Sequence, residues 1–162
     1  MHKSKKIVLL GHFGVGKTSL IRKFVENEFS ESYKVTIGVH ISKKKLLTNT
    51  NEEMSLIIWD IEGTKDLKST RSSYLLGTHG VLYVFDVNRP TTYNTIDEDL
   101  LLINKWCPKA PIKVIGNKID LLTEEDIRAK LEKKIIHNDF LTSAKTGNQV
   151  ETSFYELAKE LS

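Results

Sequence analysis

The sequence predicts one α/β domain, spanning residues 1–162, in which helices cover both faces of a six-stranded, mostly parallel sheet with one antiparallel edge strand. Two patterns lead to this three-layer architecture. Short apolar runs are nearly continuous, which is typical of strands that are covered on both faces. Between these runs, apolar residues recur every three or four positions, which is the spacing of helices packed on a sheet.

Four apolar runs rich in β-branched or aromatic residues indicate strands at residues 7–10, 56–59, 81–85 and 112–115. A shorter fifth strand is expected at 140–141. An earlier segment differs, because Val39 and Ile41 alternate with polar residues before three lysines at 43–45. Alternation followed by lysines is typical of a hairpin whose first strand lies at the edge of the sheet.

About five helices are expected between and after these strands. Helical spacing is clearest in three sets of apolar residues: Leu20, Ile21, Phe24 and Val25; Tyr93, Ile96, Leu100 and Ile103; and Val150, Phe154, Leu157, Ala158 and Leu161. Each set forms an apolar stripe that can pack on a sheet. Strands and helices therefore alternate along the chain, as a parallel sheet requires.

Composition and charge exclude several classes of protein. Lysine and arginine exceed aspartate and glutamate by 24 to 21, and a net charge of +3 is too small to argue for nucleic acid binding. The single cysteine, Cys107, forbids an internal disulfide and fits a reducing compartment. No apolar stretch approaches the ~20 residues of a membrane-spanning helix, and no cleavage site follows the basic N-terminus. We expect a cytoplasmic protein.

Residues 11–18, GHFGVGKT, fit the pattern G-x-x-x-x-G-K-[ST] and lie between the first strand and a helix. Glycines in such a loop let backbone N–H groups surround an anion, beside the positive N-terminal end of the helix. Lys17 would reach the β- and γ-phosphates of a nucleotide, and the Thr18 hydroxyl would bind Mg²⁺. The expected phosphate-binding residues are Phe13, Gly14, Val15, Gly16, Lys17, Thr18 and Ser19. The alternative is a glycine-rich turn without a ligand.

Three further motifs follow predicted strands. In the first, Asn117-Lys118-Ile119-Asp120, the last carboxylate can accept two hydrogen bonds from the N1–H and the amino group of guanine, an edge that adenine lacks. In the second, D-x-x-G, Asp60 would organise Mg²⁺ and the Gly63 N–H would bind the γ-phosphate. The third, Ser143-Ala144-Lys145, gains its value only from its position. Alone, each is compatible with an ordinary polar loop or helix cap.

These motifs resemble those of small GTPases of the Ras superfamily, and specifically of the Rab family, over residues 5–161. The segments that extend the resemblance are 33–39, 59–60, 72–74, 77–80 and 142–147. The resemblance implies a P-loop GTPase domain that binds GTP or GDP with Mg²⁺, hydrolyses GTP and acts in vesicle trafficking. Two segments, switch I around Thr36 and switch II around Gly63, would be ordered by the γ-phosphate and released after its loss.

The same resemblance implies roles for single residues. Thr36 would close over the γ-phosphate and complete the Mg²⁺ shell with Thr18 and Asp60. Phe29 would pack against the guanine ring, and Lys118 would lie along the base. Further nucleotide contacts are implied for Tyr33, Ser143, Ala144 and Lys145. The implied catalytic residues are Lys17, Thr36, Gly63 and Thr64.

The resemblance also implies protein partners. Effectors would contact an apolar surface formed by Ile41, Trp59 and Tyr74, with core packing as the alternative for Trp59. An exchange factor and a GTPase-activating protein would be further partners. No cysteine follows the last helical pattern, so no lipid anchor is visible, and membrane association would need a prenylated tail beyond Ser162.

Three residues depart from the family pattern. Thr64 stands where Rab and Ras proteins have the glutamine that orients the attacking water, and threonine is shorter and lacks the amide. Phe13 replaces a small residue and is expected to crowd the space where the glutamine and an activator's arginine finger would fit. Glu62 replaces an alanine. We therefore expect slow hydrolysis, unless Glu62 or a glutamine of an activator orients the water.

Two other classes of function remain alternatives. One is a binding module that holds GTP constitutively and titrates effectors without cycling, which Phe13 and Thr64 favour. The other is a different P-loop enzyme such as a nucleotide kinase, against which the guanine motif at 117–120 and the loop around Thr36 argue.

Overall fold

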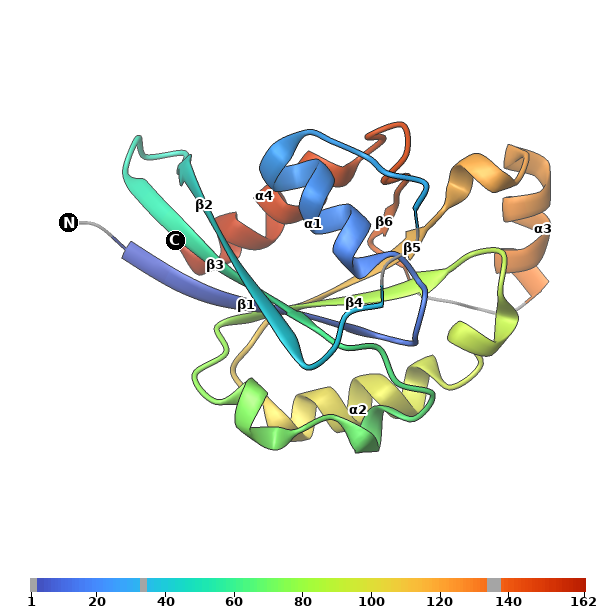
Figure 1. Cartoon of the computed structure of the whole chain (residues 1–162), viewed down its shortest axis with the longest axis horizontal. Coiled ribbons are helices and arrows are strands. Elements are labelled where there is room, and N and C mark those ends of the chain that lie inside the picture. Colours follow the sequence, from blue (N-terminus) through green and yellow to red (C-terminus); the bar gives the residue numbers. More distant parts are fainter. Residues whose placement is uncertain (1–2, 33–34, 134–137) are drawn as a thin grey trace.

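The computed structural model describes residues 3–32, 35–133 and 138–162. Its centre is a six-stranded sheet with the strand order β2-β3-β1-β4-β5-β6 (Figure 1). The strands are β1 (Lys3–Gly11), β2 (Val39–Leu47), β3 (Glu53–Ile61), β4 (Gly80–Asp86), β5 (Ile112–Asn117) and β6 (Phe140–Leu141). Neighbouring strands are parallel except at the edge, where β2 runs antiparallel to β3. The predicted sheet, with its antiparallel edge strand, is confirmed.

Helices cover both faces of the sheet, so the three predicted layers are confirmed. The α-helices of the described residues are α1 (Lys17–Glu26), α2 (Ile96–Trp106), α3 (Glu124–Lys133) and α4 (Val150–Leu161). In Figure 1, α1 and α4 lie on one face and α2 on the other. These four helices are close to the five or so expected; between β3 and β4 the chain instead forms two short 3-10 helices, η1 (Leu67–Ser69) and η2 (Ser72–Leu75).

The strands follow their hydrophobic patterns. All seven residues of β4 are buried, as its continuous apolar run predicts for a strand covered on both faces. In β2, exposed and half-buried residues alternate over much of the strand, and Lys43 and Lys45 are exposed. Charged side chains at an edge discourage pairing with another chain, so the sheet ends at β2.

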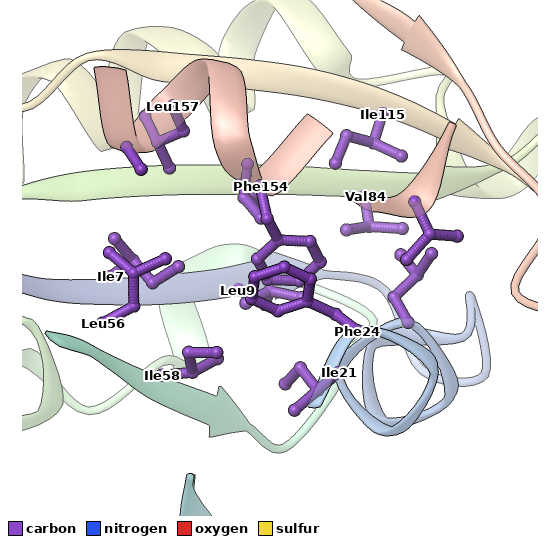
Figure 2. Close-up of a cluster of buried hydrophobic side chains, with 14 of the residues drawn as sticks. Ile7, Leu9, Ile21, Phe24, Leu56, Ile58, Val84, Ile115, Phe154 and Leu157 are labelled. Atoms are coloured by element: carbon purple, nitrogen blue, oxygen red, sulfur yellow. The ribbon is translucent and has the colours of Figure 1, made fainter. Parts of the chain in front are cut away.

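The core beneath α1 and α4 fixes the helix that follows the phosphate loop. Phe24 of α1 stacks on Phe154 of α4, with ring centroids 4.2 Å apart and an angle of 5° between the planes. Figure 2 shows this pair at the centre of the cluster, against Leu9 of β1. Because stacked aromatic residues combine large buried areas with a preferred geometry, the pair holds α1 on the sheet and its N-terminus at the carboxyl end of β1.

Candidate nucleotide-binding site

A cavity of about 370 Å³ lies where the parallel strands end. Such strand ends are where open α/β sheets bind ligands. Most of the residues singled out from the sequence line it: Phe13, Gly14, Gly16, Lys17, Thr18, Ser19, Phe29, Thr36, Asp60, Gly63, Asn117, Lys118, Asp120, Ala144 and Lys145. Six further lining residues were not predicted from the sequence: Arg22, Ser30, Glu31, Ser32, Ile61 and Leu121.

The phosphate loop wraps around the N-terminus of α1. Gly14 and Gly16 have positive φ angles of 74° and 100°, which glycine adopts without strain. A side chain at Gly16 would also overlap the amide nitrogen of Asn117, so this position needs glycine for two reasons. The loop therefore reaches the helix through a path that few other residues permit.

Donors on the protein side engage the carbonyl groups of the loop. Lys17 Nζ donates to the carbonyls of Gly11 and His12, both at 3.1 Å. Lys118 Nζ donates to Gly14 at 2.7 Å, and Asn117 Nδ2 donates to Val15 at 3.0 Å. Within a peptide unit the N–H points away from the C=O, so a loop whose carbonyls face the protein presents N–H groups to an anion.

Lys17 is a buried cation. Burial lowers the pKa of its ammonium group to about 8, while the nearby Asp60 carboxylate acts in the opposite direction. Since desolvation disfavours the charged form, an anion in the cavity would stabilise the ammonium and raise its pKa again. The environment of Lys17 thus favours a ligand with negative charge.

The threonine and aspartate oxygens expected at a Mg²⁺ site lie together. Thr18 Oγ1 is 2.7 Å from Thr36 Oγ1 and donates to Asp60 Oδ2 at 2.6 Å. The other carboxylate oxygen, Asp60 Oδ1, is buried and has no hydrogen-bond partner among the described residues. Burial raises the pKa of Asp60, an effect that a cation would oppose. Hard oxygen donors around an unsatisfied carboxylate fit Mg²⁺.

The guanine motif is held by bonds to the next loop. Ser143 Oγ donates to Asp120 Oδ1 at 2.7 Å, and the Thr142 hydroxyl donates to Asn117 Oδ1 at 3.0 Å. Lys118 pairs with Asp86 at 3.3 Å. Ser143 and Val15, both expected to contact the nucleotide, are not lining residues of the cavity; Ser143 orients Asp120, and the Val15 carbonyl anchors Asn117.

Phe29 and Tyr33 were both expected to contact the nucleotide. Phe29 lines the cavity. Tyr33 lies outside the described residues. Nearby, Glu31 and Lys145, which both line the cavity, form an ion pair of 3.1 Å between segments far apart in the sequence. Exposed ion pairs contribute little to the stability of a fold. The pair between Glu31 and Lys145 matters here because it brings the two loops together.

The residues that depart from the family pattern have defined contacts. The Thr64 hydroxyl donates to the Asp66 carbonyl at 2.8 Å, and Thr64 is not a lining residue of the cavity, whereas Phe13 is. The Glu62 carboxylate accepts a bond of 2.6 Å from the Gly38 N–H. The Glu62 N–H donates to the Gly38 carbonyl at 2.9 Å. Glu62 therefore joins switch II to switch I through side chain and backbone.

The expected effector surface is assembled from three elements. Ile41 of β2 is the register partner of Trp59 of β3, and the Trp59 ring lies 6.4 Å from that of Tyr74. Sequence reasoning missed Lys6, whose ammonium lies 3.7 Å from the centre of the Trp59 ring and donates to the Tyr74 and Leu76 carbonyls. Ile41 is about half exposed, while Trp59 also packs against the core.

The fold and the cavity together define a P-loop protein in which a second loop, at residues 117–120, lines the same cavity as the phosphate loop. A family model described as Ras family matches residues 6–162, and the chain belongs to this family as a Rab-like small GTPase of the Ras superfamily. Members of the family generally bind GTP or GDP with Mg²⁺, have GTPase activity and interact with effectors, exchange factors and activating proteins.

Curated relatives are similar over nearly the whole chain. Ras-related protein Rab-1 of Theileria annulata is 36% identical over 162 residues, covering 96% of this chain and 73% of the relative. Ras-related protein Rab-1C of Dictyostelium discoideum is 30% identical over 161 residues, covering 96% of this chain and 80% of the relative. Among the described residues, none of the helices has the length and apolar character needed to cross a membrane.

Proposed function

We propose that residues 1–162 act as one Rab-like switch domain that binds GTP or GDP with Mg²⁺ and hydrolyses GTP slowly. The proposal of slow hydrolysis rests on a contact of Thr64, whose hydroxyl donates to the Asp66 carbonyl within switch II. A hydroxyl engaged in this way, without a glutamine amide, is a poor group to orient water. The Rab names of the relatives support a role in vesicle trafficking.

The second feature that supports slow turnover is Phe13. Its side chain is 43% exposed and lines the cavity beside Gly63, whose added Cβ would lie 2.5 Å from the Phe13 Cα. Switch II thus passes directly over the phosphate loop at this residue. A phenyl ring there occupies space that an arginine finger needs, and such a finger contributes roughly 10³–10⁵ in rate where it operates.

Single-turnover GTP hydrolysis by the purified chain tests this proposal. We expect a rate well below the roughly 4 × 10⁻⁴ s⁻¹ of Ras. The double variant Thr64→Gln with Phe13→Ser should raise it. Thr64→Val is the matched control, since it keeps the shape of threonine and removes the hydroxyl; we expect it to leave the rate unchanged. A wild-type rate equal to that of Ras, or a loss of rate in the valine variant, would falsify the proposal.

A second candidate function is a GTP-bound scaffold that engages effectors through the Ile41, Trp59 and Tyr74 surface without cycling. The bonds between Glu62 and Gly38 favour it, because they join switch I directly to switch II. Identifying the nucleotide that copurifies, and the rate at which it is lost, separates the two functions. Copurified GTP that persists for many hours supports the scaffold, whereas GDP supports the switch.

A further inference from the structure

The carbonyl groups of residues 11–16 in the phosphate loop all accept hydrogen bonds, and one donor, Arg89, lies outside both the loop and the helix that follows it. Lys17, Lys118 and Asn117 account for four carbonyls, and the Leu20 N–H donates to Gly16 within α1. The remaining carbonyl, that of Phe13, accepts a bond of 3.0 Å from Arg89 Nη1. The bond spans 76 residues and belongs to no motif of the sequence.

Arg89 is mounted on a well-bonded turn after β4. Its N–H donates to the Asp86 carbonyl at 3.0 Å. Its carbonyl accepts from the Thr92 N–H at 2.9 Å and from the Thr92 hydroxyl at 2.7 Å. The Asp86 carboxylate also pairs with Lys118, which binds the next loop carbonyl. One strand end therefore anchors the cations on two successive carbonyls, those of Phe13 and Gly14.

The contact bears on the direction of one peptide unit. The peptide between Phe13 and Gly14 has its C=O directed at Arg89, so its N–H, carried by Gly14, points the opposite way. Gly14 has a positive φ of 74° and lines the cavity. Because glycine permits either orientation of the peptide, a donor outside the loop decides which one is adopted.

The guanidinium is also close enough to affect the loop electrostatically. The pKa of His12 is lowered by burial first, and the positive charges of Lys17 and Arg89 act in the same direction against the opposing charge of Asp99. Arginine keeps its charge at all accessible pH values, and a charged donor makes a stronger hydrogen bond than a neutral one. The loop thus carries a permanent positive charge on its outer side.

We propose that Arg89 is a positioning residue for phosphate binding, which holds the Phe13–Gly14 peptide with its N–H toward the nucleotide phosphates. This inference rests on the proposed function, since it takes the ligand to be a guanine nucleotide. It concerns the phosphates and not the base, because the base-recognising residues 117–120 and 143–145 have other supports.

The test compares Arg89→Met, Arg89→Lys and Arg128→Met in the full chain. Arg128 lies exposed on α3, so its replacement makes the same change in net charge away from the loop. Affinities for GDP and for GMP are measured by competition with a fluorescent GDP analogue. We expect Arg89→Met to weaken GDP about tenfold and GMP much less, because GMP lacks the phosphate that the loop holds most closely. Arg89→Lys should recover most of the loss, and Arg128→Met should resemble the wild type.

The outcomes separate this inference from the proposed function. Wild-type chain that binds neither nucleotide would overturn the proposed function and the inference with it. Wild-type binding with an Arg89→Met variant that matches Arg128→Met would overturn the inference alone. Equal losses for GDP and GMP, or an Arg89→Met chain that no longer unfolds cooperatively, would assign Arg89 a structural role and also overturn it.

Discussion

Replacing Gly16 by alanine tests how the phosphate loop and the guanine motif are joined. Gly16 has a φ of 100°, and an added Cβ would overlap Asn117 Nδ2. Asn117 is buried and connects three segments, since it donates to Val15 and accepts from Thr142 and Ala144. The methyl group must therefore displace a side chain that links the phosphate loop to the segment at residues 142–144.

Gly77 provides the matched control. Its φ of 70° is also left-handed, but an added Cβ would meet nothing within 4 Å. Alanine costs about 1 kcal/mol at either position, because left-handed strain is partly offset by the lower entropy of the unfolded chain. At Gly16 the displaced Asn117 forfeits three hydrogen bonds, each worth about 1 kcal/mol. Gly16→Ala should therefore destabilise the chain by about 3 kcal/mol more than Gly77→Ala.

Urea unfolding of the nucleotide-free proteins measures this difference without the stabilisation that a bound ligand adds. For a denaturant dependence of about 2 kcal/mol per molar, the midpoint of Gly16→Ala should lie about 1.5 M below that of Gly77→Ala. Equal midpoints for the two variants would refute the reasoning, because strain alone would then account for both losses.

Two further predictions concern the switches and the buried lysine. Glu62→Ala removes the carboxylate that accepts from the Gly38 N–H, so hydrogen exchange of that amide should become about fivefold faster. Glu151→Ala on α4 is the control and should leave this exchange rate unchanged. An unaltered exchange rate in Glu62→Ala would contradict the link between the switches. Burial lowers the pKa of Lys17 to about 8. Below that pH Lys17 is already protonated before GDP binds, and above it GDP must bind together with a proton. In the absence of Mg²⁺, the dissociation constant for GDP should rise about fourfold from pH 7 to pH 8.5. Lys17→Arg should abolish this pH dependence, because arginine stays charged. The same pH profile in wild type and Lys17→Arg would contradict the prediction.

The parts of the fold that sequence predicts best are those with a local physical cause. The continuous apolar run of β4 fixes a fully covered strand, and the lysines at 43 and 45 mark an edge. Glycines at 14 and 16 have positive φ angles, which glycine adopts without strain. Helix boundaries were less predictable: the apolar spacing begins at Tyr93, but α2 starts at Ile96 after a 3-10 turn.

The sequence could not predict contacts between segments that are far apart in the chain and share no periodic pattern. The bond of Arg89 to Phe13 and the position of Lys6 over Trp59 join residues more than 50 positions apart. Ser143 is a partial exception: its motif predicted a contact with the nucleotide, but its hydroxyl donates to the Asp120 carboxylate. Such side chains act through other residues, and the direction of a side chain depends on how the loops pack.

The three departures from the family pattern form one connected unit in space. Glu62 binds switch I at Gly38, Thr64 forms a backbone bridge with His12, and between them Gly63 touches the Phe13 backbone. Residues in contact rarely change rates independently. Restoring glutamine at Thr64 alone leaves the Phe13 ring and the Glu62 link in place, so each single variant should recover little hydrolysis. The Thr64→Gln, Phe13→Ser pair should therefore gain more in logarithmic rate than the sum of the two single effects. Strict additivity of the two logarithmic rate changes would mean that the two residues obstruct different steps, and the shared obstruction inferred from their geometry would be wrong.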